Sequence, residues 1–202
     1  IALNNISAEQ ADQVIYKMRS YIQSATKETM VQNNNAFRRF LFDENSFPFG
    51  KDGENINICF FDEEDMSRNY CVVTNQWVYP RTTTHGGKRL DLVFINNSIP
   101  MVNSEMKTPL TPGITWTDST NDNVKYQKSI PAMFVTNILN FASDGKELFY
   151  GGIGLPVDKW GPWFGTEDRQ HGTLTPTFDN FCHLMNPRRL WDIYRYYTVF
   201  TA

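Results

Sequence analysis

The chain has 202 residues and a formal net charge of −3, with 41% hydrophobic and 14% aromatic residues. This length allows one domain with a substantial core, and the composition is that of an ordinary globular protein. The acidic balance excludes a protein that coats nucleic acid by bulk electrostatics, and no apolar run is long enough to cross a membrane. A role on DNA would therefore need a local basic track, for which three pairs are candidates: Arg38-Arg39, Lys88-Arg89 and Arg188-Arg189.

The cysteine pattern bears on the compartment. The three cysteines, Cys59, Cys71 and Cys182, lie too far apart for a zinc motif or a disulfide framework. We expect them to be reduced and buried, in a cytoplasmic protein with no membrane partner. Because the first residue is Ile, we expect the chain to be part of a longer protein, with residues 1–202 forming one domain.

The first third of the chain predicts two helices followed by two strands. Ser7 and Gln10 have the spacing of a capping box, and apolar residues then recur at helical intervals. The run Asn33-Asn34-Asn35 is expected to interrupt the helical pattern. The helices are expected over 7–30 and 36–42, and the strands over 56–61 and 70–79, after a loop over 43–54.

Residues 89–109 predict a β-hairpin that carries charged residues on both strands. Asp91 and Glu105 are equidistant from Ser98, which lies in the turn-prone sequence Asn-Asn-Ser. A turn there sets the two carboxylates opposite each other, and Lys107 points to the same side as Glu105 because side chains alternate along a strand. Acids that interrupt apolar strands in this way are unusual for a purely structural role.

The rest of the chain predicts further helices and strands in a mixed arrangement. A polar loop is expected over 110–121, and residues 155–202 are expected to be loop-rich until a final helix. The other elements are expected as helices over 122–130 and 186–200 and strands over 133–142 and 147–153. This order predicts an α/β (α+β) fold with a central mixed sheet flanked by helices.

The hairpin residues have the chemistry of a phosphodiesterase site. Mg²⁺ is held in proteins by one or two carboxylates together with water and substrate oxygens, so Asp91 and Glu105 suffice as ligands. The main-chain carbonyl of Met106 is a plausible third ligand. Lys107 would lie beside the metal, where its charge can orient the attacking water or stabilise developing negative charge.

The same residues resemble a known family. Residues 89–109 look like the nuclease motif of the PD-(D/E)xK superfamily, with a restriction-endonuclease-like core. More narrowly, the chain resembles the amino-terminal nuclease domain of the R subunit of type I restriction–modification enzymes. The resemblance continues through three later segments: Lys125–Asn137, Ala142–Gly151 and Asn186–Phe200.

The resemblance implies specific roles. Asp91, Glu105 and Lys107 would be catalytic, with Asp91 and Glu105 binding Mg²⁺. The family carries a Gln-x-x-x-Tyr that positions DNA; Tyr126 matches its tyrosine, Asp122 falls at its glutamine, and Gln127 is the alternative in a second register. The upstream helper acid of the family has only Glu28 as a candidate.

Partners and alternatives also follow from the resemblance. The implied partners are double-stranded DNA and the methyltransferase and specificity subunits of a restriction complex. ATP would serve only motor domains outside these residues, since the chain has no P-loop motif. Two alternatives stay open: a catalytically idle domain that docks or guides DNA, and a nuclease domain from another restriction system.

Overall fold

A computed structural model describes residues 3–80, 86–165 and 172–200. Its centre is a six-stranded sheet in the order β3-β4-β5-β6-β7-β8, in which only β5 and β6 run parallel. The strands are β3 Cys71–Tyr79, β4 Lys88–Asn96, β5 Ile99–Met106, β6 Leu139–Ser143, β7 Leu148–Gly151 and β8 Gly161–Pro162. A small separate ladder pairs β1 Ser46–Phe47 with β2 Ile56–Asn57.

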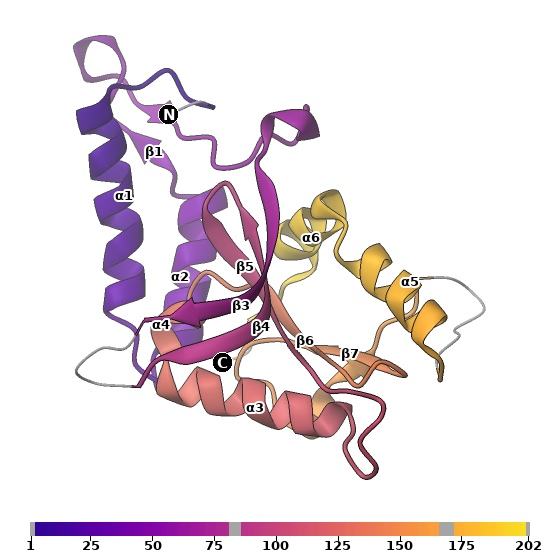
Figure 1. The fold of residues 1–202 in the computed structure, drawn as a ribbon. Helices are drawn as coiled ribbons and strands as arrows, with labels where there is room; N and C mark the ends of the chain where they lie inside the picture. The colour runs from indigo at the N-terminus through magenta and orange to yellow at the C-terminus, as the bar shows by residue number, and fades with distance from the viewer. Residues whose placement is uncertain (1–2, 81–85, 166–171, 201–202) are drawn as a thin grey trace.

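Helices surround this sheet, as Figure 1 shows: α1 and α2 lie on one side, α5 and α6 on the other, and α3 runs along the lower edge of the view. The parallel pair β5–β6 requires a crossover, which α3 and α4 provide. The helices are α1 Ala8–Gln23, α2 Met30–Phe42, α3 Trp116–Ser129, α4 Pro131–Phe134, α5 Leu174–Leu184 and α6 Pro187–Asp192. The expected α/β fold, with a mixed central sheet flanked by helices, is confirmed.

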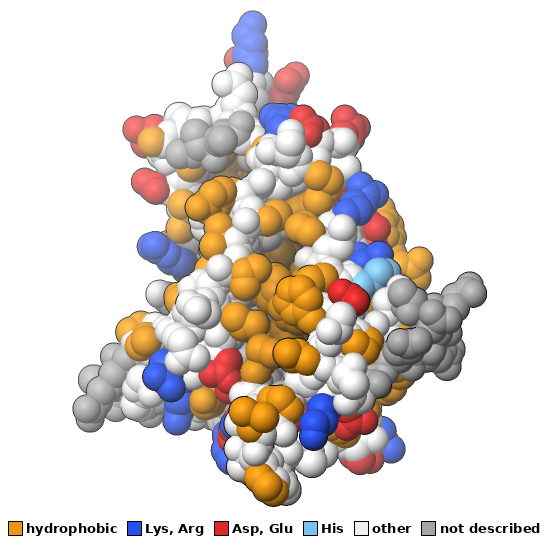
Figure 2. Space-filling model, turned by 45° about the vertical axis from the view of Figure 1, so that its right-hand side comes forward, with side chains coloured by type: hydrophobic (Ala, Val, Ile, Leu, Met, Phe, Trp, Pro, Cys, Tyr) orange, Lys and Arg blue, Asp and Glu red, His pale blue; other side chains and the backbone are white. Residues whose placement is uncertain are grey.

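The main hydrophobic core joins α1, α2 and the C-terminal helices to the sheet. Phe40 of α2, Phe141 of β6 and Tyr194 are fully buried members of this cluster. A smaller cluster forms around Leu90 and Val93 of β4 together with Met30 and α4. Figure 2, turned so that the side of α5 and α6 comes forward, shows hydrophobic side chains gathered at the centre of that face, with charges of both signs around them.

Helix α3 packs on β5 and β6 through polar side chains. Asn103 Nδ2 donates to Asn123 Oδ1 at 2.6 Å, and Asn123 Nδ2 donates to the Phe141 carbonyl at 3.3 Å. Ser119 Oγ donates to the Ser143 carbonyl at 3.1 Å. Buried polar groups need such partners, so these directional bonds fix how α3 lies across the two strands. The helix begins earlier than the expected residue 122, because Thr115 and Asp118 form a capping box within the polar stretch.

The N-terminal helices differ from the prediction. The expected helix over 7–30 ends at Gln23, and the Asn33-Asn34-Asn35 run lies inside α2 rather than interrupting it. The reason is tertiary. The buried Asn34 amide donates to the carbonyls of Phe134, Val135 and Asn137. These bonds outweigh the weak intrinsic preference of asparagine against helix.

Two predicted strands are shorter than expected. Of residues 56–61 only β2 pairs, because the following apolar residues Ile58 and Phe61 pack into the core while the main chain of Cys59 bonds to the side chain of Asn4. Of residues 133–142 the first part is helical. Pro131 takes the first position of α4, where its missing N–H costs nothing, and β6 starts only at Leu139.

The tail and the cysteines also differ from the prediction. The expected loop-rich stretch contains α5, whose Pro176 lies in the first turn, where proline is tolerated. The predicted last helix is present as α6 followed by a π-helical turn at Ile193–Tyr197.

The cysteines are free thiols but not buried: Cys59 is half-buried and the other two are exposed, since Cys71 starts the edge strand β3 and Cys182 lies on the outer side of α5. Within the described residues, no helix is long and apolar enough to span a membrane.

Candidate active site

The predicted hairpin is formed by β4 and β5 and turns at two residues. Asn97 and Ser98 have φ values of 47° and 69°, the left-handed pair of a type I′ turn. The turn alone would not place the two carboxylates opposite each other. The pairing shifts between Ile95↔Pro100 and Phe94↔Val102, which leaves Met101 as an extra residue on β5.

This bulge sets the register of the site. Beyond it, Leu92 pairs with Ser104, and the next step along the ladder brings Asp91 opposite Glu105. The Asp91 amide N lies 3.4 Å from Glu105 Oε1, and the Met106 amide N donates to Asp91 Oδ2 at 2.9 Å. The hairpin therefore brings both predicted metal ligands together.

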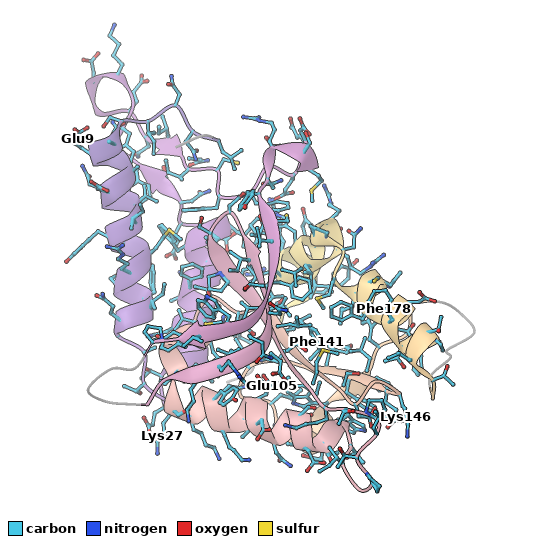
Figure 3. All side chains as sticks on the ribbon, viewed as in Figure 1. Glu9, Lys27, Glu105, Phe141, Lys146 and Phe178 are labelled. Atoms are coloured by element: carbon cyan, nitrogen blue, oxygen red, sulfur yellow. The ribbon has the colours of Figure 1, made fainter. Side chains whose placement is uncertain are left out.

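Glu105 is the most buried charged group of the site, at 3% exposure. Figure 3 shows it between the hairpin and α3. Burial, reinforced by the negative charge of Asp91, raises the pKa of Glu105 to about 8. Both effects disfavour a second negative charge at this place, and a bound cation would relieve both.

Lys107 follows the end of β5 and is held by α3. Its Nζ lies 2.6 Å from Asp122 Oδ2, and Lys125 Nζ lies 2.8 Å from Asp122 Oδ1. The hydrogen bond to Asp122 raises the pKa of the Lys107 ammonium, so Lys107 is charged at neutral pH. Burial alone would raise the pKa of Asp122, but the bonds from the two lysines outweigh it and lower that pKa.

Of the two other residues considered for DNA positioning, one lies at the site and one does not. Tyr126 Oη donates to the Arg89 carbonyl at 3.3 Å. Burial is the main cause, and the negative charge of Glu105 the second, of a rise in the pKa of Tyr126 to about 12. Gln127 instead is buried, and its Oε1 accepts from the Gly154 amide at 2.8 Å. The structure thus gathers Tyr126 and Asp122 near the carboxylates and assigns Gln127 to packing.

The chemistry of the donors fits a hard divalent cation. Two adjacent carboxylates and a neighbouring main-chain carbonyl at Met106 are oxygen ligands of the kind that Mg²⁺ takes. Among the residues that the structure describes, no group of three His, Cys, Asp or Glu is placed to hold a metal. The remaining ligands would have to be main-chain oxygen, water and substrate phosphate, as is usual for Mg²⁺.

Glu28, considered as a helper acid, pairs with Lys27 in the turn between α1 and α2, and its side chain is 65% exposed. The described contacts do not connect it to the hairpin. Another contact of the site could not be predicted from the sequence: Gln76 of β3 donates from Nε2 to Asp91 Oδ1 at 3.2 Å. A single glutamine on an edge strand belongs to no motif that would mark it as part of the site.

Comparison with known proteins identifies the family. Residues 2–153 match the family described as the type I restriction enzyme R protein N terminus. Because this match covers most of the chain, the chain belongs to that family, as the resemblance predicted. A curated relative, the type I restriction enzyme HindI endonuclease subunit of Haemophilus influenzae, is 27% identical over 191 residues. That alignment covers 90% of this chain and 18% of the relative, so the chain spans less than a fifth of the relative's length.

Proposed function

We propose that these residues form the nuclease domain of a type I restriction enzyme R subunit and hydrolyse DNA phosphodiesters with Mg²⁺. The observation that carries the proposal is the register of the β4–β5 hairpin, which brings Asp91 opposite Glu105 with Lys107 two residues further on. Family membership and the relative named as an endonuclease subunit support the same function.

Each residue of the cluster has a role in this proposal. Asp91, Glu105 and the Met106 carbonyl would hold the cation, which would polarise the phosphate and lower the pKa of its bound water. Lys107 is held in place by Asp122 and is available to orient the water or stabilise charge on the phosphate. Because Glu105 is buried, water access is restricted on the protein side, which strengthens these electrostatic interactions.

The approach of DNA is supported by charges around the acidic cluster. Lys88 lies over the Tyr126 ring, and the exposed Arg89, Lys125 and Lys128 lie on the adjoining strand and helix. The other two basic pairs have internal partners: Arg38 donates to the carbonyls of Tyr194 and Arg195, while Arg188 pairs with Asp192. Of the three candidate pairs, only Lys88-Arg89 adjoins the site, so we assign it to the phosphate backbone.

The rest of the proposal concerns the complete enzyme. ATP-driven translocation would come from other domains of the R subunit, and sequence recognition from the methyltransferase and specificity subunits. The isolated domain, with its net charge of −3, is expected to bind DNA weakly and to depend on delivery by the complex.

Cleavage of circular DNA by the assembled enzyme tests this function. Lys107→Ala is expected to abolish cleavage while leaving ATP hydrolysis intact, and Asp158→Asn, in an exposed pair with Lys159, is the matched control. Cleavage by Lys107→Ala at the unaltered rate would instead indicate a catalytically idle domain.

A further inference from the structure

Gln76 has an unusual backbone for its position. Among the described residues, those other than glycine with positive φ are Asp52, Gln76, Asn97 and Ser98. Asn97 and Ser98 make the hairpin turn, and Asp52 lies in the short helical turn Lys51–Gly53. Gln76, with a φ of 51°, instead lies in the middle of β3. Left-handed backbone costs an L-residue about 1–2 kcal/mol, so its presence inside a strand needs a reason.

The irregularity lies directly beside the candidate site. β3 pairs with β4 at Asn75↔Leu92 and again at Trp77↔Leu90, which leaves Gln76 next to Asp91. From Cys71 to Asn75 every second side chain of β3 is exposed, beginning with Cys71. From Trp77 on the alternation is reversed, so that the even-numbered side chain of Val78 is the exposed one. The break in the strand thus occurs at the one residue across from the carboxylate.

The side chain of Gln76 uses this placement. Its Nε2 donates to Asp91 Oδ1 at 3.2 Å, while the Met106 amide donates to Asp91 Oδ2 at 2.9 Å. The carboxylate is therefore held from β3 on one side and from β5 on the other. An uncharged amide suits this task, because it orients a carboxylate without competing with a cation for its charge.

We propose that Gln76 is a positioning residue that orients Asp91 for the divalent cation. The inference rests on the proposed nuclease function and adds a residue from the edge strand to the hairpin residues. The left-handed backbone turns the amide of Gln76 toward Asp91, and the backbone strain is the consequence of that orientation. Partners of this kind typically change metal affinity 10- to 100-fold when they are removed.

Iron-directed cleavage of the full-length protein tests this role without relying on DNA hydrolysis. Fe²⁺ in place of Mg²⁺, with ascorbate and peroxide, cuts the polypeptide near the bound ion, and mass spectrometry maps the cuts. Wild type is expected to be cut near residues 91 and 105. Added Mg²⁺ is expected to reduce this cleavage, because it competes with Fe²⁺ for the site. Gln76→Gly removes the amide and the strain, while Gln76→Met removes the amide but keeps the length of the side chain. Both variants are expected to need about 10-fold more Fe²⁺ for the same cleavage.

Asp52→Gly is the matched control, because it releases a left-handed residue in the Lys51–Gly53 turn and is expected to be cut like wild type. If either Gln76 variant needs no more Fe²⁺ than wild type for the same cleavage, the positioning role is overturned. Asp91→Asn separates this failure from that of the proposed function. If Asp91→Asn abolishes the cuts while the Gln76 variants are cut at the Fe²⁺ concentration that suffices for wild type, only the positioning role fails. If wild type is not cut near these residues, or Asp91→Asn is cut equally, the metal site itself is wrong.

Discussion

Lys107 Nζ lies 2.6 Å from Asp122 Oδ2, so the candidate catalytic lysine on the hairpin is held in place by helix α3. The family has a glutamine where this chain has Asp122, and the resemblance therefore assigned Asp122 to DNA positioning. A carboxylate there repels phosphate but can hold an ammonium group. The geometry favours a role for Asp122 in placing Lys107.

Asp122→Asn is therefore expected to reduce the DNA cleavage rate of the assembled enzyme about 10-fold, because Lys107 loses its fixed geometry. The pKa of Lys107 would fall toward its ordinary value, which still leaves the ammonium charged at neutral pH. The loss of rate should accordingly appear at pH 7, where Lys107 is charged with or without Asp122. A rate equal to that of wild type would contradict this role.

Glu105 predicts a pH dependence of stability for the metal-free protein. Its pKa is about 8 in the folded state and about 4.5 unfolded, so the folded state binds more protons between these values. The contribution of Glu105 to the free energy of unfolding should therefore be greatest below about pH 4.5 and be lost as the pH rises through about 8. Each pKa unit corresponds to about 1.4 kcal/mol, which bounds the effect at about 5 kcal/mol.

Urea unfolding in EDTA at pH 5 and pH 8 measures this loss, and Glu105→Gln is expected to reduce it. Adding Mg²⁺ should stabilise the protein more at pH 8 than at pH 5, since the cation binds the ionised carboxylate. An equal pH dependence in wild type and Glu105→Gln would show that other groups cause it.

Asn34 predicts a large effect on stability far from the site. Its amide donates to three main-chain carbonyls, and Asn34→Ala would leave those of Val135 and Asn137 without this donor in the core, while the Phe134 carbonyl still accepts from the Asn137 amide. We expect a loss of about 3 kcal/mol in the free energy of unfolding. The exposed neighbour Gln32→Ala should change it by less than about 0.5 kcal/mol. Similar values for the two variants in urea unfolding would refute the proposed reason for the continuous α2.

The hairpin turn predicts a stabilising change. Ser98 has a φ of 69°, and glycine is the preferred residue at this position of a type I′ turn. Ser98→Gly should raise the free energy of unfolding by about 0.5–1 kcal/mol. Ser20→Gly, inside α1, should instead lower it by about 0.5–1 kcal/mol. A loss of stability in Ser98→Gly would mean that the turn is held by other contacts.

The sequence predicted those features that depend on neighbours in the chain. The β4–β5 hairpin follows from side-chain alternation and from the turn residues Asn97 and Ser98, and the last helix follows from its own periodicity. The placement of Asp91 opposite Glu105 was expected from symmetry about Ser98. It arises differently, from a two-residue turn combined with a bulge at Met101.

The features that the sequence did not predict depend on distant partners. Asn34 is stabilised in a helix by carbonyls about a hundred residues away, and α5 is anchored by Thr177, which donates to the Lys146 carbonyl. Likewise, the ion pair between Lys107 and Asp122 and the contact of Gln76 with Asp91 exist only once α3 and β3 are packed on the hairpin. Local patterns carry no information about such pairs.

The central claim is that the carboxylates of this hairpin carry DNA cleavage. The most direct test is Asp91→Ala in the assembled enzyme, measured as the rate of double-strand cleavage of circular DNA in Mg²⁺, with DNA binding and ATP hydrolysis followed in parallel. We predict that cleavage falls at least about 1,000-fold while binding and ATP hydrolysis stay at the wild-type level. Cleavage at the wild-type rate by Asp91→Ala would contradict the assignment of the site.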